Sequence, residues 1–358
     1  MAKFDLHFLR KESYLAVDIG TASIKIVELD SSREKPTLKN YAILETSGHL
    51  ERPNDAIQTS SLKIIDKETA GFLRVLMSEM KTKARSVVAS LPAFSAFTAL
   101  VDLPVMSSEE ISKAMRYQAK NFVPLPITEV TLDWLPIVKL TDEKGVKKQR
   151  LFLTAVPNEQ IKRYQNIFRL AGLSLQVLEI ETVSLARVLT DSDPTNTLII
   201  DIGARSTAIA IAAGGLLKYS SQTDFSGGYL TQAIANGLGI NVRRAEELKR
   251  RRGLLGSGGE YEVSTLMLPY LDVILGEARR VKNLYEKNYR EKIERIILAG
   301  GGANLLGVEK YVADQFRLPA LKASPFVKIG YLPLIAPFAG NLGAPLAVSL
   351  GLGMRRNN

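Results

Sequence analysis

Apolar and polar residues repeat one arrangement in two separate stretches of the chain. In residues 14–29 (YLAVDIGTASIKIVEL) and 198–211 (LIIDIGARSTAIAI), an apolar run ends in Asp-Ile-Gly, passes through Ser and Thr, and leads into a second apolar run. Each stretch predicts a β-hairpin closed by a glycine turn. One copy alone would fit an ordinary hairpin of a mixed sheet, but the repeat indicates two related half-domains that face each other across a cleft.

The pattern elsewhere predicts alternating strands and helices, and therefore an α/β fold. Between the hairpins we expect strands at 37–46, 86–91, 97–103, 130–138, 150–156 and 175–179, and helices at 66–80, 107–121, 158–170 and 181–189. After the second hairpin we expect strands at 216–222 and 293–299, and helices at 229–237, 242–251, 265–288, near 307 and at 343–353. The spacing of Ser107 and Glu110 is that of a capping box at a helix start.

These elements group into two lobes and an insertion. Residues 85–172 have the order β-β-α-β-β-α, which suits a small α+β module, and the polar run 191–196 (DSDPTN) is typical of a linker. The predicted organisation is a first lobe (1–84), the inserted module (85–172), the rest of the first lobe with the linker (173–196), a second lobe (197–324) and a C-terminal segment that returns to the first lobe (325–358).

Composition narrows the function classes. The 358 residues suffice for two lobes, and the absence of cysteine excludes disulfides and thiolate metal sites. The most apolar stretch, 197–217, is interrupted by Asp201 and Arg205, so we expect neither a signal peptide nor a membrane span, and a cytoplasmic protein. A net charge of +10 suits acidic partners, but without interleaved basic and aromatic residues we expect no nucleic acid.

The two hairpin turns carry candidate phosphate-binding chemistry. Gly20 and Gly203 permit a tight turn in which main-chain N–H groups approach an anion. Hydroxyl groups follow both glycines, on Thr21, Ser23, Ser206 and Thr207. Asp18 and Asp201 would repel a bare phosphate, so they fit best as direct or water-mediated ligands of a Mg²⁺ bound to the phosphates.

Three further motifs are candidates for the rest of a nucleotide site. Gly227 and Gly228 precede a helix, where an anion or a ribose could approach closely. Gly300, Gly301 and Gly302, followed by Asn304, end a buried strand, which fits either a flat adenine or a tight structural turn. Glu246 and Lys249 are three residues apart and so lie on one helix face. They could form a solvent-exposed ion pair, or they could contact a ribose or base.

The order of these motifs resembles the actin-like ATPase superfamily, which includes actin, sugar kinases and FtsA. DIGTASIK resembles its first phosphate motif, DIGARSTAIAI the second, ILAGGGANLLG the adenosine motif and SGGYLTQAIA the connecting segment. The insertion resembles the 1C (SHS2-type) subdomain of FtsA and of the PilM family of type IV pilus assembly proteins. VVASLP, QAKNFVPLPITEVTLDW, FLTAVPNEQI and LTQAIANGLGINVRRAEELK are similar to the PilM family in particular.

The resemblance implies a site for ATP and Mg²⁺ between the lobes. It places Asp18, Gly20, Thr21, Ser23 and Lys25 at the first phosphate loop, and Asp201, Gly203, Ser206 and Thr207 at the second. It places Glu246 and Lys249 at the ribose and base, and Gly300, Gly301, Gly302 and Asn304 at the adenosine. Arg205 stands where the family's second loop is expected to have a small residue, so it points either at phosphate or away from it.

The resemblance also implies a function. We expect an ATP-binding scaffold of a type IV pilus or type II secretion machine, peripheral to the inner face of the cell membrane, with only indirect membrane contact. Its partners would be the N-terminal tail of a PilN-like membrane protein, held between the insertion and the first lobe, other pilus assembly proteins, and a further copy of itself. Helix 109–122 and the VPLP loop after it are the candidates for the tail surface.

Three points stay open at the level of sequence. No residue is identified that would position water, so hydrolysis is expected to be slow or absent. An FtsA-like division protein is a first alternative, although the basic membrane helix expected of that family is not seen after residue 353. A sugar-kinase-like phosphotransferase is the second alternative.

Overall fold

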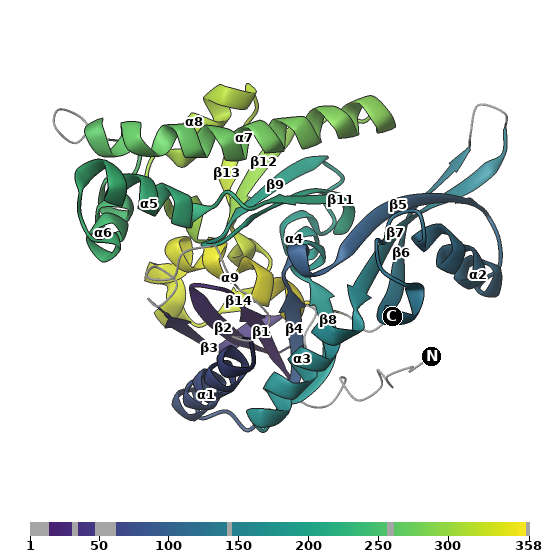
Figure 1. Cartoon of the computed structure of the whole chain (residues 1–358), viewed down its shortest axis with the longest axis horizontal. Coiled ribbons are helices and arrows are strands. Elements are labelled where there is room, and N and C mark those ends of the chain that lie inside the picture. The colour runs from purple at the N-terminus through teal and green to yellow at the C-terminus, as the bar shows by residue number, and fades with distance from the viewer. Residues whose placement is uncertain (1–13, 31–34, 47–61, 142–144, 256–260, 356–358) are drawn as a thin grey trace.

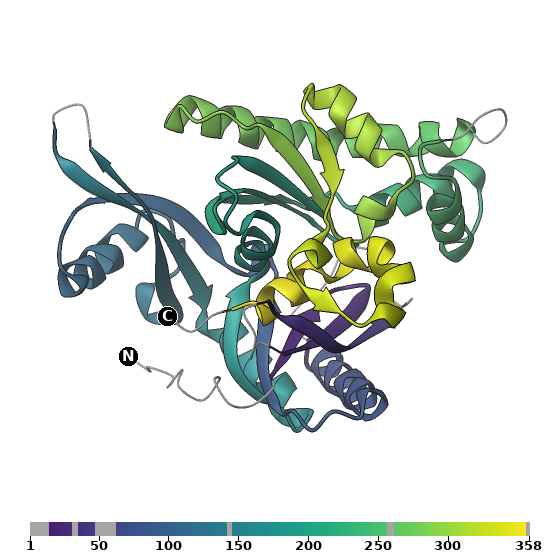
Figure 2. The ribbon, with the colours of Figure 1, turned by 180° about the vertical axis from the view of Figure 1, so that it is seen from behind.

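We describe a computed structural model of the chain over residues 14–30, 35–46, 62–141, 145–255 and 261–355. Figures 1 and 2 show two lobes, each with a mixed sheet and flanking helices, and a smaller sheet that projects to one side. The predicted α/β class with two lobes and an inserted module is therefore confirmed.

The first lobe contains a six-stranded sheet in the order β14-β3-β2-β1-β4-β8. Its strands are β1 (Leu15–Ile19), β2 (Ser23–Asp30), β3 (Thr37–Glu45), β4 (Ser86–Leu91), β8 (Ser174–Ile180) and β14 (Gly330–Tyr331). The first three form an antiparallel meander, and β4 runs parallel to both β1 and β8. Buried side chains of α1 (Leu62–Met80) and α3 (Asn158–Leu170) share one core with this sheet, while α4 (Glu181–Thr190) and α9 (Ala339–Gly353) pack in a second core.

The second lobe repeats this plan with a five-stranded sheet in the order β11-β10-β9-β12-β13. Its strands are β9 (Thr197–Ile202), β10 (Thr207–Ala213), β11 (Leu216–Thr223), β12 (Arg295–Ala299) and β13 (Ala320–Lys322). Its helices are α5 (Gly227–Leu238), α6 (Val242–Arg252), α7 (Tyr261–Tyr289) and α8 (Val308–Phe316). The antiparallel pair β9–β10 is the second predicted hairpin, with β12 parallel to β9 as β4 is to β1.

The inserted module is narrower than the predicted 85–172. Its separate sheet has the order β5-β7-β6, formed by β5 (Phe97–Pro104), β6 (Val130–Thr141) and β7 (Lys147–Pro157), with α2 (Ser108–Ala119) beside it. The predicted first strand of the module, β4, pairs instead inside the first-lobe sheet, and the predicted last helix, α3, packs on α1. The capping box at Ser107 and Glu110 is present.

The C-terminal segment packs against the first lobe. The Tyr14 hydroxyl donates to the carbonyl of Gly353 at 2.7 Å, and Arg187 donates to the carbonyl of Gly351 at 2.8 Å. The helical run Pro333–Gly353 is long and apolar enough to cross a membrane, but half of it is buried within the molecule. Because α9 packs on α4 and on strands β1, β2 and β4, its apolar character is that of a core helix.

Glu179 ties this C-terminal segment to the first lobe, and it gives a test of the fold. Its buried carboxylate accepts hydrogen bonds from Ser184 (2.7 Å), from both terminal nitrogens of Arg187 and from Arg355 (2.6 Å). Burial raises the pKa of Glu179, but the two arginines and Ser184 outweigh burial and leave the pKa lowered.

We expect Glu179→Gln to lower the free energy of unfolding at pH 7 by about 2–4 kcal/mol, because it leaves two guanidinium groups without their buried partner. The folded-state pKa lies below the unfolded one, so this difference should hold above the unfolded pKa and diminish as the pH falls through the folded pKa. Urea unfolding at several pH values measures it. Glu247→Gln removes an exposed ion pair with Arg244 and should change stability by less than about 1 kcal/mol.

Candidate functional site

The turns of both hairpins are closed by the same hydrogen bond. The N–H of Gly20 donates to the carbonyl of Ser23 at 3.0 Å, and the N–H of Gly203 donates to the carbonyl of Ser206 at 3.0 Å. A Cβ at these glycines would lie 3.0 Å from Ser23 O and 2.8 Å from Ser206 O. The glycines are therefore required by the turns themselves. Their N–H groups are already engaged, so a phosphate would have to find other donors, such as the exposed Thr21.

Lys25 and Asp18 form the floor of the site in the first lobe. The Lys25 ammonium lies 2.9 Å from Asp18 Oδ2, and the Ser90 hydroxyl donates to Asp18 Oδ1 at 2.7 Å. Burial lowers the pKa of Lys25, but the Asp18 carboxylate more than compensates and the pKa is raised. The lysine is therefore a permanent cation at neutral pH.

Asp201 meets this pair from the second lobe. Burial raises the pKa of Asp201 to about 6, with the charge of Asp18 acting in the same direction and that of Lys25 opposing it. These interactions couple the charges of the two hairpins electrostatically, while their predicted role at a nucleotide stays a prediction.

Glu181 is a third carboxylate among these coupled charges, and the sequence analysis missed it. It begins α4 directly after β8, and its Oε1 accepts a hydrogen bond from the N–H of Ala93 at 2.9 Å. Burial raises its pKa to about 8, helped by the charges of Asp201 and Asp18. An acidic residue at the carboxyl end of a parallel strand was the signal in the sequence, because ligand sites of α/β sheets gather there.

The second hairpin is held against the start of α5. The N–H of Gly227 donates to the carbonyl of Gly203 at 2.9 Å, and the N–H of Gly228 donates to the carbonyl of Ala204 at 3.0 Å. A Cβ on Gly228 would lie 2.6 Å from that carbonyl oxygen, so this glycine allows the close approach. Thr207 is buried, and its hydroxyl donates to the carbonyl of Phe225 at 2.8 Å, which fixes the segment before α5.

Glu246 and Lys249 form a largely buried ion pair. Lys249 Nζ lies 2.6 Å from Glu246 Oε2 and donates to the carbonyl of Gly227 at 2.9 Å, while Thr231 donates to the same carboxylate. The two side chains are 14% and 17% exposed, so the solvent-exposed ion pair allowed by the spacing is not what the structure contains. Burial raises the pKa of Glu246, but Lys249, Thr231 and Arg250 lower it to about 2.

The glycine run after β12 has one open position. Gly300 has φ +73°, and a Cβ there would collide with Asp201 and Ile202. A Cβ on Gly302 would collide with the Ile202 side chain, whereas Gly301 is exposed and has nothing within 4 Å of that position. Asn304 is held by Lys322 Nζ at 3.2 Å and by the carbonyl of Asn341 at 3.3 Å. The tight turn explains two of the glycines, and Gly301 leaves room for a flat group.

Two contacts join the lobes across the site. Arg250 lies between Glu246 of its own helix (2.9 Å) and Glu45 at the end of β3 (3.2 Å). The guanidinium of Arg205 lies 5.3 Å from the centre of the Phe94 ring, which belongs to the short helix η3 (Ala93–Ser95) between β4 and β5. Arg205 therefore points toward the junction of the first lobe and the insert.

Comparison with solved structures agrees with this architecture. The structure of a "PilM-PilN type IV pilus biogenesis complex" matches with a TM-score of 0.81 and 25% identity, over 96% of this chain and 98% of that one. Two further structures share the actin-like fold. The ethanolamine utilization protein EutJ of Carboxydothermus hydrogenoformans matches with a TM-score of 0.56 and 17% identity, over 96% of this chain and 90% of that one. MreB5 of Spiroplasma citri, bound to AMPPNP, matches with a TM-score of 0.51 and 16% identity, over 95% of both chains.

The sequence model of a protein family matches almost the whole chain, from residue 16 to residue 357, and the description of that family is type IV pilus assembly protein PilM. The match includes both hairpins, the insert and α9. The chain therefore belongs to the PilM family of type IV pilus assembly proteins.

Proposed function

We propose that this protein is an ATP-binding scaffold of a type IV pilus assembly machine, bound at the inner face of the cell membrane through the N-terminal tail of a PilN-like protein. The observation that carries the proposal is the match of nearly the entire chain, insert included, to the PilM chain of a complex with PilN. Neither an FtsA-like division role nor a sugar-kinase role is favoured by that match.

The nucleotide would lie between the lobes. The first hairpin offers the Thr21 and Ser23 hydroxyls and the cation of Lys25, and the second offers the Ser206 hydroxyl. The adenosine would lie beside Gly301, where nothing fills the space that a Cβ would occupy. Because Glu246 and Lys249 hold α6 to α5, they would position the ribose and base side of the site as well as contact it.

The residues present fit Mg²⁺. Asp18 and Asp201 supply carboxylate oxygens from the two lobes, and Mg²⁺ commonly binds one or two carboxylates together with waters and nucleotide phosphates. Over the described residues there is no group of three or more His, Cys, Asp and Glu side chains placed for a metal, so the nucleotide phosphates would have to supply the other ligands. When bound, the ion would neutralise phosphate charge and screen the two carboxylates from each other.

Hydrolysis would depend on Glu181. A carboxyl group with a pKa near 8 carries its proton at neutral pH and cannot accept another from water. A cation bound near Asp201 would lower that pKa and free Glu181 to take a proton at its carboxylate. This favours nucleotide binding as the main activity, with slow turnover at most.

Calorimetry of Mg-AMPPNP binding tests the metal ligands. Asp18→Asn and Asp201→Asn should each weaken binding by about tenfold or more, since each loses a charged ligand. That factor corresponds to about 1.4 kcal/mol. In EDTA the same variants should bind the bare nucleotide as well as the parent does, or better, because a carboxylate repels phosphate.

Asp314→Asn, on the exposed face of α8, is the control and should change neither measurement. Unaltered Mg-AMPPNP affinity in both site variants would remove the metal roles of Asp18 and Asp201.

The raised pKa of Glu181 predicts a pH dependence of stability. Its folded-state pKa of about 8 exceeds the usual 4.5, so between these values the folded state holds a proton that the unfolded state releases. The nucleotide-free protein should therefore lose stability from pH 6 to pH 8, and Glu181→Gln should remove about 1–2 kcal/mol of that loss. Urea unfolding at both pH values measures the difference; equal pH slopes for parent and variant would contradict it.

The partner tail would contact the insert near α2. Tyr117 is 69% exposed and Phe122 is 45% exposed, so two aromatic side chains lie on the surface of the segment predicted from sequence. We expect Tyr117→Ser with Phe122→Ser to weaken binding of a peptide with the sequence of the PilN-like tail by about tenfold or more.

Fluorescence anisotropy of the labelled peptide provides the measurement. Val327→Ser with Leu334→Ser, at two exposed apolar positions near the C-terminal segment, is the matched control. Equal loss in both double variants would place the tail elsewhere.

A further inference from the structure

Arg205 is a cation without an ionic partner at the edge of an acidic site. Over the described residues its guanidinium makes no ion pair and no hydrogen bond, although Asp201 lies only four residues earlier in the sequence. Its recorded contact is the face of Phe94, 5.3 Å from the ring centre, in a different lobe. A partly buried arginine of this kind keeps its hydrogen-bonding capacity for a ligand.

The backbone that carries Arg205 is fixed from both sides. The Gly203–Ser206 bond closes its turn, and the carbonyl of Ala204 accepts from the N–H of Gly228 and, at 2.9 Å, from the hydroxyl of Ser226. Arg205 can therefore change its target only by rotating its side chain. The phosphates of a nucleotide would lie at this same turn.

The other half of the contact lies on the connection into the insert. Ala93 is buried against Ile180 of the first lobe and Ala208 of β10, and its N–H is held by Glu181. The next residue, Phe94, is 41% exposed, and β5 of the insert begins at Phe97. The Arg205–Phe94 contact thus joins the turn between β9 and β10, where phosphate is proposed to bind, to the short helix η3 that leads into the insert.

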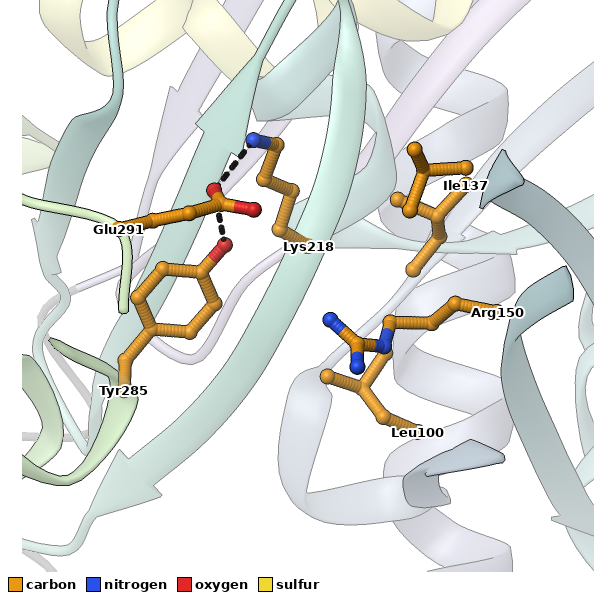
Figure 3. Close-up of a pocket in the computed structure, with 7 residues that line it drawn as sticks. Leu100, Ile137, Arg150, Lys218, Tyr285 and Glu291 are labelled. Atoms are coloured by element: carbon orange, nitrogen blue, oxygen red, sulfur yellow. Dashed lines mark hydrogen bonds and ion pairs between the residues drawn. The ribbon is translucent and has the colours of Figure 1, made fainter. Parts of the chain in front are cut away.

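The insert also packs against the second lobe, where Leu100 and Ile137 lie beside the main core that contains buried Phe152 of β7. A cavity of about 130 Å³ lies there, between Leu100, Ile137 and Val138 of the insert and Lys218, Tyr285 and Glu291 of the second lobe (Figure 3). Lys218 and Tyr285 both bond to Glu291 within their own lobe, at 2.7 and 2.8 Å.

Arg150, which also lines this cavity, pairs with Asp102 inside the insert. It reaches the second lobe by stacking 4.2 Å from the centre of the Tyr289 ring. The polar groups at this interface are therefore satisfied inside each body, and the cavity leaves space between the two bodies.

We propose that Arg205 links nucleotide binding to the position of the insert, an inference that rests on the proposed ATP site. Without nucleotide the guanidinium stacks on Phe94 and holds the connecting segment to the second lobe. A bound triphosphate draws the guanidinium away, because a charge-assisted bond to phosphate is stronger than an exposed cation–π contact. The connecting segment then loses this contact, and the insert shifts relative to the second lobe.

The absence of cysteine from the chain permits a direct test. Glu109→Cys on α2 and Lys292→Cys after α7 are exposed positions on the insert and the second lobe, and each would carry a spin label. Double electron–electron resonance should show a changed or broadened distance distribution when Mg-AMPPNP is added. In the Phe94→Ala background the nucleotide-free protein should already show that distribution, and nucleotide should change it little.

Calorimetry measures the reciprocal effect, that of the Arg205–Phe94 contact on nucleotide affinity. Phe94→Ala should bind Mg-AMPPNP about two- to five-fold more tightly, because the guanidinium no longer has to leave the ring. Arg205→Gln should bind more weakly, and its distance distribution should match that of Phe94→Ala. Leu135→Ala, at another apolar position of the insert that is 41% exposed like Phe94, is the matched control and should leave nucleotide affinity and distances as in the parent.

The outcomes distinguish failure of the proposed ATP-binding function from failure of the proposed Arg205–Phe94 link. If the parent binds no nucleotide, the proposed function is wrong. If the parent binds nucleotide while Phe94→Ala changes neither affinity nor distance distribution, the Arg205–Phe94 link is overturned and the ATP site stands.

Discussion

The structure depends on an imbalance of buried charge where the two lobes meet. Three carboxylates, those of Asp18, Asp201 and Glu181, lie around one buried ammonium, that of Lys25. The lysine compensates Asp18, and burial then raises the pKa values of the other two, with each nearby negative charge adding to the rise. All three carboxylates can be ionised together only if a further cation neutralises them. We therefore expect the packing of the two lobes here to depend on pH and on metal binding.

Local sequence signals predicted most of the fold. The repeated Asp-Ile-Gly turns identified both hairpins, since the alternation of apolar residues and the glycine lie within a few residues of each other. The insert boundaries were less accurate. Whether β4 belongs to the insert or to the first lobe is decided by its parallel pairing with β1 and β8, strands far from it in the sequence.

The residues of the candidate site also divide into those that the sequence predicted and those that it did not. Asp18, Lys25 and Asp201 lie inside the repeated motif, and the charges of the first two act on the pKa of Asp201, but their role at a nucleotide stays a prediction. Glu181 was missed because its role comes from burial beside charges on other elements, which no spacing in the sequence records. The glycines were predicted to approach a nucleotide, and the structure shows a packing role for several of them: Gly203 closes its own turn, and Gly228 lets α5 approach Ala204.

The short helix η3 explains how a nucleotide could act on a partner without rapid hydrolysis. One end of this segment is fixed by Glu181 and by packing against Ala208, and the other carries the insert, with Phe94 facing Arg205 between them. A ligand shifts such an equilibrium only by its difference in affinity for the two arrangements. Because the turn proposed to bind phosphate also carries the arginine that contacts this segment, that difference would arise at the phosphates themselves. Binding alone would then be enough to move the insert, and a scaffold built this way would use ATP as a structural ligand.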